Sequence, residues 1–138
     1  MTDTIKTEQP WYGRLTIFKG ETLMEAVPQF TDSTGNPFDL TDKRFDLYIR
    51  PDANDSAHLI AHLTSDSGGE IIITDAENGL VDIVVEVEAI DAADAYPVGE
   101  WWHFMDMTFD DPDYGLSVKT VWRGPCIIRA DDRSIPGT

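Results

Sequence analysis

The sequence has little cysteine and few basic residues. Its single cysteine, Cys126, excludes an intrachain disulfide, and its place in the apolar run Cys126-Ile127-Ile128 predicts a buried, unreactive thiol. Ten basic residues stand against 26 acidic ones, which gives a formal net charge of −16. A surface of this sign repels phosphate backbones, so we expect no nucleic-acid partner. The acidity itself fits three explanations: solubility, salt-rich surroundings that screen the repulsion, or a basic partner surface.

Long apolar segments are also absent. No stretch approaches the roughly 20 apolar residues of a membrane span, and the first ten residues lack the apolar centre of a signal peptide. We therefore expect no membrane partner, and synthesis and folding in a cytoplasm. The length, 138 residues, predicts one domain.

The sequence does contain a regular alternation of apolar and polar residues. Turn residues break the alternation about every 8–12 positions, which predicts an all-β fold, an antiparallel β-sandwich of about seven to nine strands. The clearest strand covers 80–88, where valine and isoleucine alternate with mostly charged residues on a face that must meet water. The other strands are expected at 14–18, 22–30, 44–50, 58–64, 71–73, 100–109, 116–124 and 126–130.

Three segments fall outside this pattern. Residues 89–95 are alanine-rich and predict one short helical turn between two strands. Residues 1–13 are expected to form a polar N-terminal arm, and residues 132–138 a flexible tail. The β-sandwich domain is therefore expected to span 14–131.

Four aromatic residues are candidates for a partner interface. Trp101 and Trp102 are adjacent, so on a strand they face opposite sides, and one of them must meet solvent or a partner. An exposed tryptophan is a typical interface anchor, and it also suits stacking on a sugar ring. Trp11 and Tyr12, at the end of the arm, are expected to anchor it on this domain or on a neighbour.

No residue pattern marks a catalytic, cofactor or metal site. His58 and His62 lie in HLIAH, but position 59 is Leu where the zinc-protease motif has a glutamate, and residues four apart on a strand lie about 13 Å apart. The loop Asp110-Asp111-Pro112-Asp113 lacks the ligand spacing of an EF-hand, which leaves a solvated turn and an irregular calcium site as alternatives. Nucleophile-elbow, phosphate-cradling and dinucleotide motifs are missing. We expect a non-catalytic protein without a cofactor.

Several short segments recur in an order known from bacteriophage virion domains. Residues 18–22 (FKGET) are similar to the opening F-x-x-G-D-T, and residues 32–41 (DSTGNPFDLT) to the segment D-x-x-G-x-P-x-D-L-T-G, of one such family. The other similar segments are 45–50, 79–101 and 121–128. The family is the Ig-like domain found at the N-terminus of baseplate upper proteins and in many small phage tail or neck proteins, and the resemblance covers 14–131.

The sequence departs from the family pattern in three ways. Asp42 stands where the family has a turn glycine, and the stretch after Gly99 is rich in tryptophan and methionine. No long fibre or coiled-coil extension follows the domain. The last departure favours a free-standing adaptor over the anchor of a receptor-binding fibre.

The resemblance implies an Ig-like β-sandwich with a structural role and no catalytic residues. It implies an adaptor or assembly component of the tail, neck or baseplate, located in the virion and bound to other virion proteins. Repeated copies in a ring or lattice would let weak contacts add up. Two alternatives stay open: a capsid decoration or head-fibre protein, and a carbohydrate-binding module.

Overall fold

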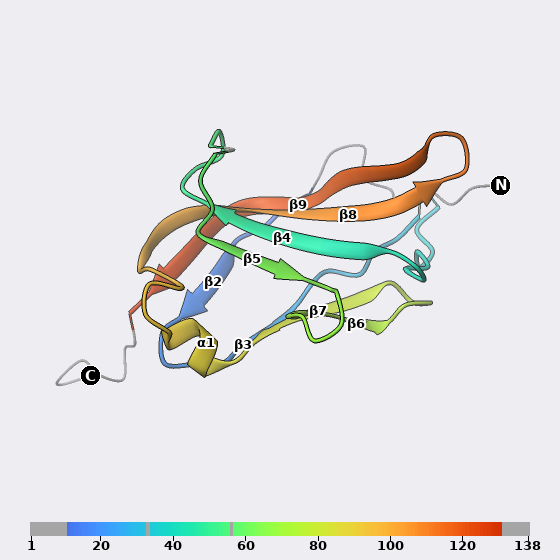
Figure 1. Cartoon of the computed structure of the whole chain (residues 1–138). Coiled ribbons are helices and arrows are strands. Elements are labelled where there is room, and N and C mark those ends of the chain that lie inside the picture. Colours follow the sequence, from blue (N-terminus) through green and yellow to red (C-terminus); the bar gives the residue numbers. More distant parts are fainter. Residues whose placement is uncertain (1–10, 33, 56, 131–138) are drawn as a thin grey trace.

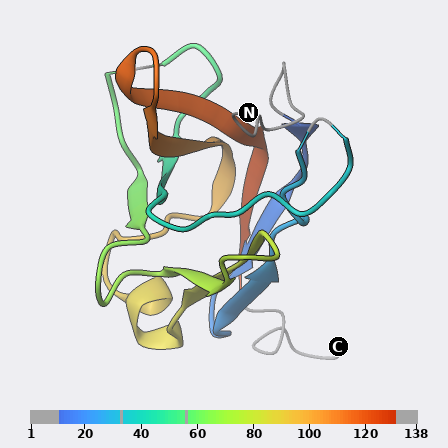
Figure 2. The ribbon, with the colours of Figure 1, turned by 90° about the vertical axis from the view of Figure 1, so that its right-hand side faces the viewer.

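Two β-sheets packed face to face form the fold (Figures 1 and 2). The structure, a computed structural model, describes residues 11–130 except 33 and 56, and of Trp11 the backbone alone. The expected arm residues 1–10 and the tail 132–138 lie outside this described part. The predicted all-β sandwich is confirmed.

The larger sheet has six strands in the order β1-β9-β8-β4-β5, and β2 also pairs with β9. These strands are β1 (Trp11–Tyr12), β2 (Leu15–Phe18), β4 (Arg44–Arg50), β5 (Ala61–Thr64), β8 (Gly99–Asp111) and β9 (Gly115–Arg129). β1 and β2 run parallel to β9, while the other neighbours are antiparallel. The prediction of a wholly antiparallel sandwich is therefore wrong for β1 and β2.

The smaller sheet has three strands in the order β3-β7-β6. Its strands are β3 (Leu23–Ala26), β6 (Ile71–Asp75) and β7 (Leu80–Val85), all antiparallel to their neighbours. β3 is shorter than the expected strand 22–30, because Pro28 has no backbone N–H for a ladder. Beyond Pro28, the backbone N–H of Phe30 still donates to the carbonyl of Gly79 (3.0 Å).

The core lies between the two sheets and follows the predicted alternation. Alternate residues of both sheets point inward and are buried: Leu15, Ile17, Phe45, Leu47, Ile49, Leu63, Ile71, Val81, Ile83, Val85, Met105, Met107, Cys126 and Ile128. Burying one large apolar side chain contributes about 1.5–3 kcal/mol. Cys126 is fully buried as expected, and burial raises the pKa of its thiol to about 12.

The strand expected at 80–88 ends early. β7 stops at Val85, which pairs with the first residue of β3, Leu23, so a longer strand would have no partner on that side. The chain turns instead into a short helix, α1 (Val87–Asp91). Helix therefore replaces the end of the predicted strand.

The helical turn predicted at 89–95 is present but begins two residues earlier. Its one buried side chain, Ile90, packs into the core. The Lys19 ammonium donates hydrogen bonds to the carbonyls of Ile90 and Tyr96, and the backbone N–H of Gly20 donates to the Asp91 carboxylate (2.9 Å). The bond from Lys19 satisfies the carbonyl of Ile90 near the C-terminal end of the helix, where a positive charge is favourable.

β9 is one continuous strand rather than the two predicted ones. Pro125 was expected to interrupt it, but β1 pairs with β9 only up to Arg123, and β2 starts to pair with β9 at Cys126. The proline therefore lies opposite the gap between β1 and β2, where a backbone donor is not needed. The backbone of Gly13, in the gap between β1 and β2, passes close to Gly124. A Cβ at Gly124 would lie 2.3 Å from the carbonyl oxygen of Gly13, so only glycine fits there.

Two aspartates organise the loop between β3 and β4. The carboxylates of Asp32 and Asp39 accept hydrogen bonds from the backbone N–H groups of Thr34 (2.8 Å) and Thr41 (2.9 Å), and from both threonine hydroxyls (2.6 Å each). These bonds, those from the hydroxyls above all, hold the pKa of both carboxyls below the usual value. Hydrogen bonds of this kind, between an aspartate carboxylate and the backbone N–H two residues on, order a loop that has no strand partner.

Asp42, at the end of this loop, has a φ of +63°, a left-handed conformation that favours glycine. Asp42 is the position at which the sequence departs from the turn glycine of the phage pattern.

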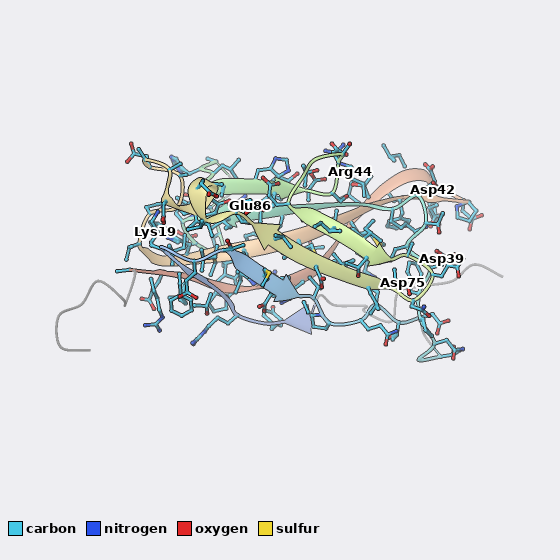
Figure 3. All side chains as sticks on the ribbon, turned by 90° about the horizontal axis from the view of Figure 1, so that it is seen from below. Lys19, Asp39, Asp42, Arg44, Asp75 and Glu86 are labelled. Carbon is cyan, nitrogen blue, oxygen red and sulfur yellow. The ribbon has the colours of Figure 1, made fainter. Side chains whose placement is uncertain are left out.

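Figure 3 shows Asp39, Asp42 and Asp75 at one end of the sandwich and Lys19 and Glu86 at the other. Among the described residues, no helix is long and apolar enough to cross a membrane.

Candidate functional site

The outer face of the six-stranded sheet carries more aromatic and basic side chains than such an acidic chain suggests. The alternation in β4 turns Phe45, Leu47 and Ile49 inward, and therefore turns the other residues outward. The outward residues of β4 are Arg44, Asp46, Tyr48 and Arg50, and those of the central part of β8 are Trp102, Phe104, Asp106 and Thr108.

Two of these side chains, Tyr48 and Phe104, form one row across the sheet with three from other strands, and we call this row the aromatic row. In register, His62 of β5 is opposite Tyr48 of β4, and Tyr48 is opposite Phe104 of β8. Phe104 is opposite Arg123 of β9, which is in turn opposite Tyr12 of β1. Side chains directly opposite each other on one face are close enough to interact. The row therefore joins residues between 12 and 123 in the sequence.

The two ends of the aromatic row have defined contacts. The rings of Tyr48 and His62 are stacked, with centroids 4.7 Å apart and an angle of 5° between their planes. At the other end, the Arg123 guanidinium lies 4.9 Å from the ring centroid of Tyr12 and donates hydrogen bonds to its hydroxyl, one at 3.0 Å. Cation–π contacts of this kind stabilise an exposed pair by about 0.5–1 kcal/mol.

The buried carboxylate of Asp46, two residues before Tyr48 on β4, contacts His62 at one end of the aromatic row. His62 Nε2 donates to Asp46 Oδ1 (2.8 Å), and Arg44 Nε lies 3.1 Å from Asp46 Oδ2. Burial by itself raises the pKa of Asp46, but hydrogen bonds from His62, Arg44 and Thr64 outweigh it and hold the pKa below the usual value. Asp46 is therefore an ionised anchor that orients the His62 ring against Tyr48.

A cleft of about 480 Å³ opens on this face. Its lining consists of sheet residues and of loop residues 53–55 from the β4–β5 connection. The sheet residues are Tyr48, Arg50, Phe104, Asp106 and Thr120. Thr120 Oγ1 donates to Asp106 Oδ1 (2.7 Å). The Arg50 guanidinium lies 5.3 Å from the ring centroid of Tyr48 and donates to the carbonyl of His58 (2.8 Å), which holds the loop over the sheet.

The four predicted interface residues lie in different environments in the structure. Tyr12 is 59% exposed and belongs to the aromatic row. The backbone of Trp11 pairs with Trp122, and its side chain lies outside the described part of the chain. Trp101 points inward, packs against the core and donates its indole N–H to the carbonyl of Pro97 (2.8 Å). Trp102 is the outward member of the pair, but it is half-buried, and its indole nitrogen is buried without a hydrogen-bond partner among the described residues.

Sequence reasoning missed Tyr48 and Phe104, which are central to the face. The alternation in 44–50, which puts Phe45, Leu47 and Ile49 on one face of a strand, contained the signal for Tyr48 on the other face. The sequence likewise puts Phe104 on the same face as Trp102, but nothing marked it as a neighbour of Tyr48. That proximity depends on the pairing of β4 with β8, which residues far apart in sequence determine.

A buried histidine lies beneath this face. His103 is fully buried, packs edge-on against Trp122 at 4.3 Å between centroids, and donates from Nε2 to the carbonyl of Gly13 (2.7 Å). Its other ring nitrogen is buried, and no residue in the described ranges forms a hydrogen bond with it. Burial lowers the pKa of His103 to about 4, so the ring is neutral at pH 7.

The other two histidines are on separate elements. His58 lies in the β4–β5 connection and donates from Nδ1 to the Asp55 carboxylate (2.8 Å), whereas His62 lies on β5 and bonds to Asp46. In the loop 110–113, Asp111 accepts hydrogen bonds from the backbone N–H groups of Asp113 and Tyr114. Within the described ranges, no group of three or more His, Cys, Asp or Glu side chains is placed to hold a metal ion.

The hairpin of β8 and β9 exposes further apolar side chains. Tyr114 is 85% exposed, Leu116 75% and Val118 63%. Leu116 and Val118 are opposite Asp110 and Thr108, so they lie on the same outer face as the aromatic row.

Neither protein-family models nor curated proteins gave a match to this chain.

Proposed function

We propose that this chain is a bacteriophage virion structural protein, a non-catalytic adaptor of the tail, neck or baseplate that acts through protein–protein contacts. The observation that carries the proposal is the outer face of the six-stranded sheet, where the aromatic row spans β5, β4, β8, β9 and β1. Aromatic and arginine side chains are enriched in protein interfaces, and the exposed Leu116 and Val118 extend this face with apolar surface.

The assignment to a virion rests on the ordered turn segments in the sequence. The conformation of Asp42 supports it, because this aspartate has the positive φ that the family's turn glycine would adopt. Asp32 and Asp39, the two aspartates of the same segment, both order the loop through hydrogen bonds to the backbone. The segment that resembles the phage pattern therefore has a physical role in the fold, and an Ig-like arrangement of the sandwich is part of the proposal.

The net charge of −16 further supports a hetero-assembly. Copies of such a chain repel each other. In a ring or lattice, a second protein with a less acidic or a basic surface must therefore lie between the copies. Multiple copies on one particle would then give avidity from individually weak contacts.

The test is sedimentation velocity of the purified chain, alone and mixed with the protein products of the genes that flank its own. The proposal predicts that the chain co-sediments with a tail, neck, baseplate or capsid protein. Co-sedimentation with a capsid protein alone would favour the decoration-protein alternative. If the flanking genes encode no virion protein and none of their products binds, the proposal is wrong.

A further inference from the structure

The cleft on the outer sheet face contains a carboxylate, that of Asp106, which forms no ion pair within the described part of the chain. Asp106 is half-buried, and its Oδ1 accepts the Thr120 hydroxyl hydrogen bond. In register it is opposite Asp46, yet Arg44 and His62 bind Asp46 and not Asp106. Among the residues that the structure describes, Asp106 has no ion pair. A half-buried carboxylate of this kind is stabilised when a cation pairs with it.

The surroundings of Asp106 suit a cation with a flat or apolar stem. Phe104 is two residues away on the same strand and face, and it lines the cleft together with Tyr48. Aromatic faces attract guanidinium and ammonium groups, and a guanidinium also pairs with a carboxylate through two parallel hydrogen bonds.

Three charged groups contribute to the balance of charge in the cleft. Asp106 and Asp55 are negative and Arg50 is positive. Arg50 is held against Tyr48 and the carbonyl of His58, and Asp55 is occupied by His58. The cleft therefore has a net negative charge, and the carboxylate that remains for a ligand is that of Asp106.

We propose that this cleft binds a basic side chain, an arginine, of the partner protein. The proposal rests on the proposed adaptor function and specifies its partner: the docking surface presents an arginine that stacks on Phe104 and pairs with Asp106. A second copy of the chain is a poor source of that arginine, because its net charge of −16 opposes self-association.

The test uses the full chain labelled with nitrogen-15 and the peptide acetyl-Gly-Arg-Gly-amide as the probe. We expect saturable shifts of backbone amide signals in 53–55, in 104–106 and at Thr120, with an affinity of about millimolar. The matched peptide with citrulline, which keeps the shape but not the charge, should bind at least about fivefold more weakly. Equal affinity for the two peptides, or no saturable shift with the arginine peptide, overturns the proposal.

Two variants control for non-specific attraction to an acidic protein. Asp106→Asn should weaken the arginine peptide by about fivefold, because it removes the charge and keeps the shape. Asp82→Asn, a half-buried outward carboxylate on β7 of the other sheet, should leave the affinity unchanged. Equal losses in both variants contradict a specific site. Shifts of the cleft signals by neutral oligosaccharides, and none by the arginine peptide, assign the cleft to sugars instead.

The outcome is separable from that of the proposed function. If a virion partner binds wild-type and Asp106→Asn chains equally, the adaptor function stands and the arginine site is wrong. If the peptide binds in the cleft but no virion protein binds the chain, the site stands and the virion assignment is wrong.

Discussion

His103 donates a hydrogen bond from Nε2 to the carbonyl of Gly13, and thereby ties the entry of the chain into β2 to the centre of β8. The contact buries an imidazole whose charged form is disfavoured, because its second ring nitrogen has no hydrogen-bond partner in the part of the chain that the structure describes. The pKa of His103 is lowered to about 4, whereas an unfolded chain has a histidine pKa of about 6.5. This difference makes stability depend on pH.

The first prediction is a loss of stability in mild acid. Because the folded pKa is depressed, the unfolded chain binds a proton first as the pH falls below about 6.5, and the stability present above that pH is lost progressively down to about pH 4. Between pH 7 and pH 5 we expect the free energy of unfolding to fall by about 2 kcal/mol from His103 alone. Urea unfolding at both pH values measures it. The variant His103→Gln should lose most of this dependence, and an unchanged slope in the variant would contradict the assignment.

The second prediction concerns Asp46. At pH 7 its carboxylate pairs with Arg44 and His62 while being almost fully buried, so Asp46→Asn should lower the free energy of unfolding by about 2 kcal/mol. The pKa of Asp46 is below the usual value, so its contribution is present above about pH 4 and is lost as the pH falls further. Thermal unfolding of the variant and of Asp82→Asn compares a paired buried carboxylate with a half-buried one on the other sheet. Equal effects of the two substitutions would argue against the Asp46 network.

The third prediction compares two glycines to separate the energetic cost of backbone conformation from that of steric crowding. Gly79 and Gly68 both have positive φ, +69° and +80°, but only at Gly79 would a Cβ lie 2.5 Å from the carbonyl oxygen of Phe30. Gly68→Ala should cost about 1 kcal/mol from backbone strain, and Gly79→Ala about 3 kcal/mol because the loop must also move. Denaturant midpoints of the two variants provide the comparison. Similar midpoints would mean that the close approach of the β6–β7 turn to Phe30 is absent.

The fourth prediction addresses the turn that departs from the phage pattern. Asp42 has a φ of +63°, so Asp42→Gly should raise the free energy of unfolding by about 0.5 kcal/mol, while Asp42→Ala should lower it by a similar amount. Thermal unfolding of the three proteins should therefore rank them glycine, aspartate, alanine. An alanine variant as stable as the glycine variant would remove this support for the resemblance.

Local signals in the sequence predicted much of the fold. The segment 44–50 alternates in hydrophobicity and ends at Pro51, and β4 covers these residues. The limits of β7 and β9 were wrong for non-local reasons. β7 ends where β3 begins to pair, and β9 continues through Pro125 because β1 and β2 leave a gap there.

The candidate site was less predictable than the strands. Tyr12 was predicted from the sequence as an interface residue, whereas Tyr48 and Phe104 become candidates only when β4 pairs with β8 and β9 pairs with β1. Adjacency of Trp101 and Trp102 correctly implied opposite faces. It did not reveal that the outward one is half-buried, since that depends on neighbouring strands and loops.

The central claim, that the outer face of the six-stranded sheet binds the partner, is tested most directly by comparing one variant on each sheet. Phe104→Ala removes the middle of the aromatic row, and Met24→Ala removes a side chain that is 75% exposed on the outer face of the three-stranded sheet. With circular dichroism confirming that both variants keep their β-structure, the dissociation constant for the proposed virion partner is measured for each. We expect Phe104→Ala to weaken binding by about 30-fold and Met24→Ala to leave it unchanged. Unchanged binding by Phe104→Ala, with a loss in Met24→Ala, would place the interface on the opposite sheet and contradict the account.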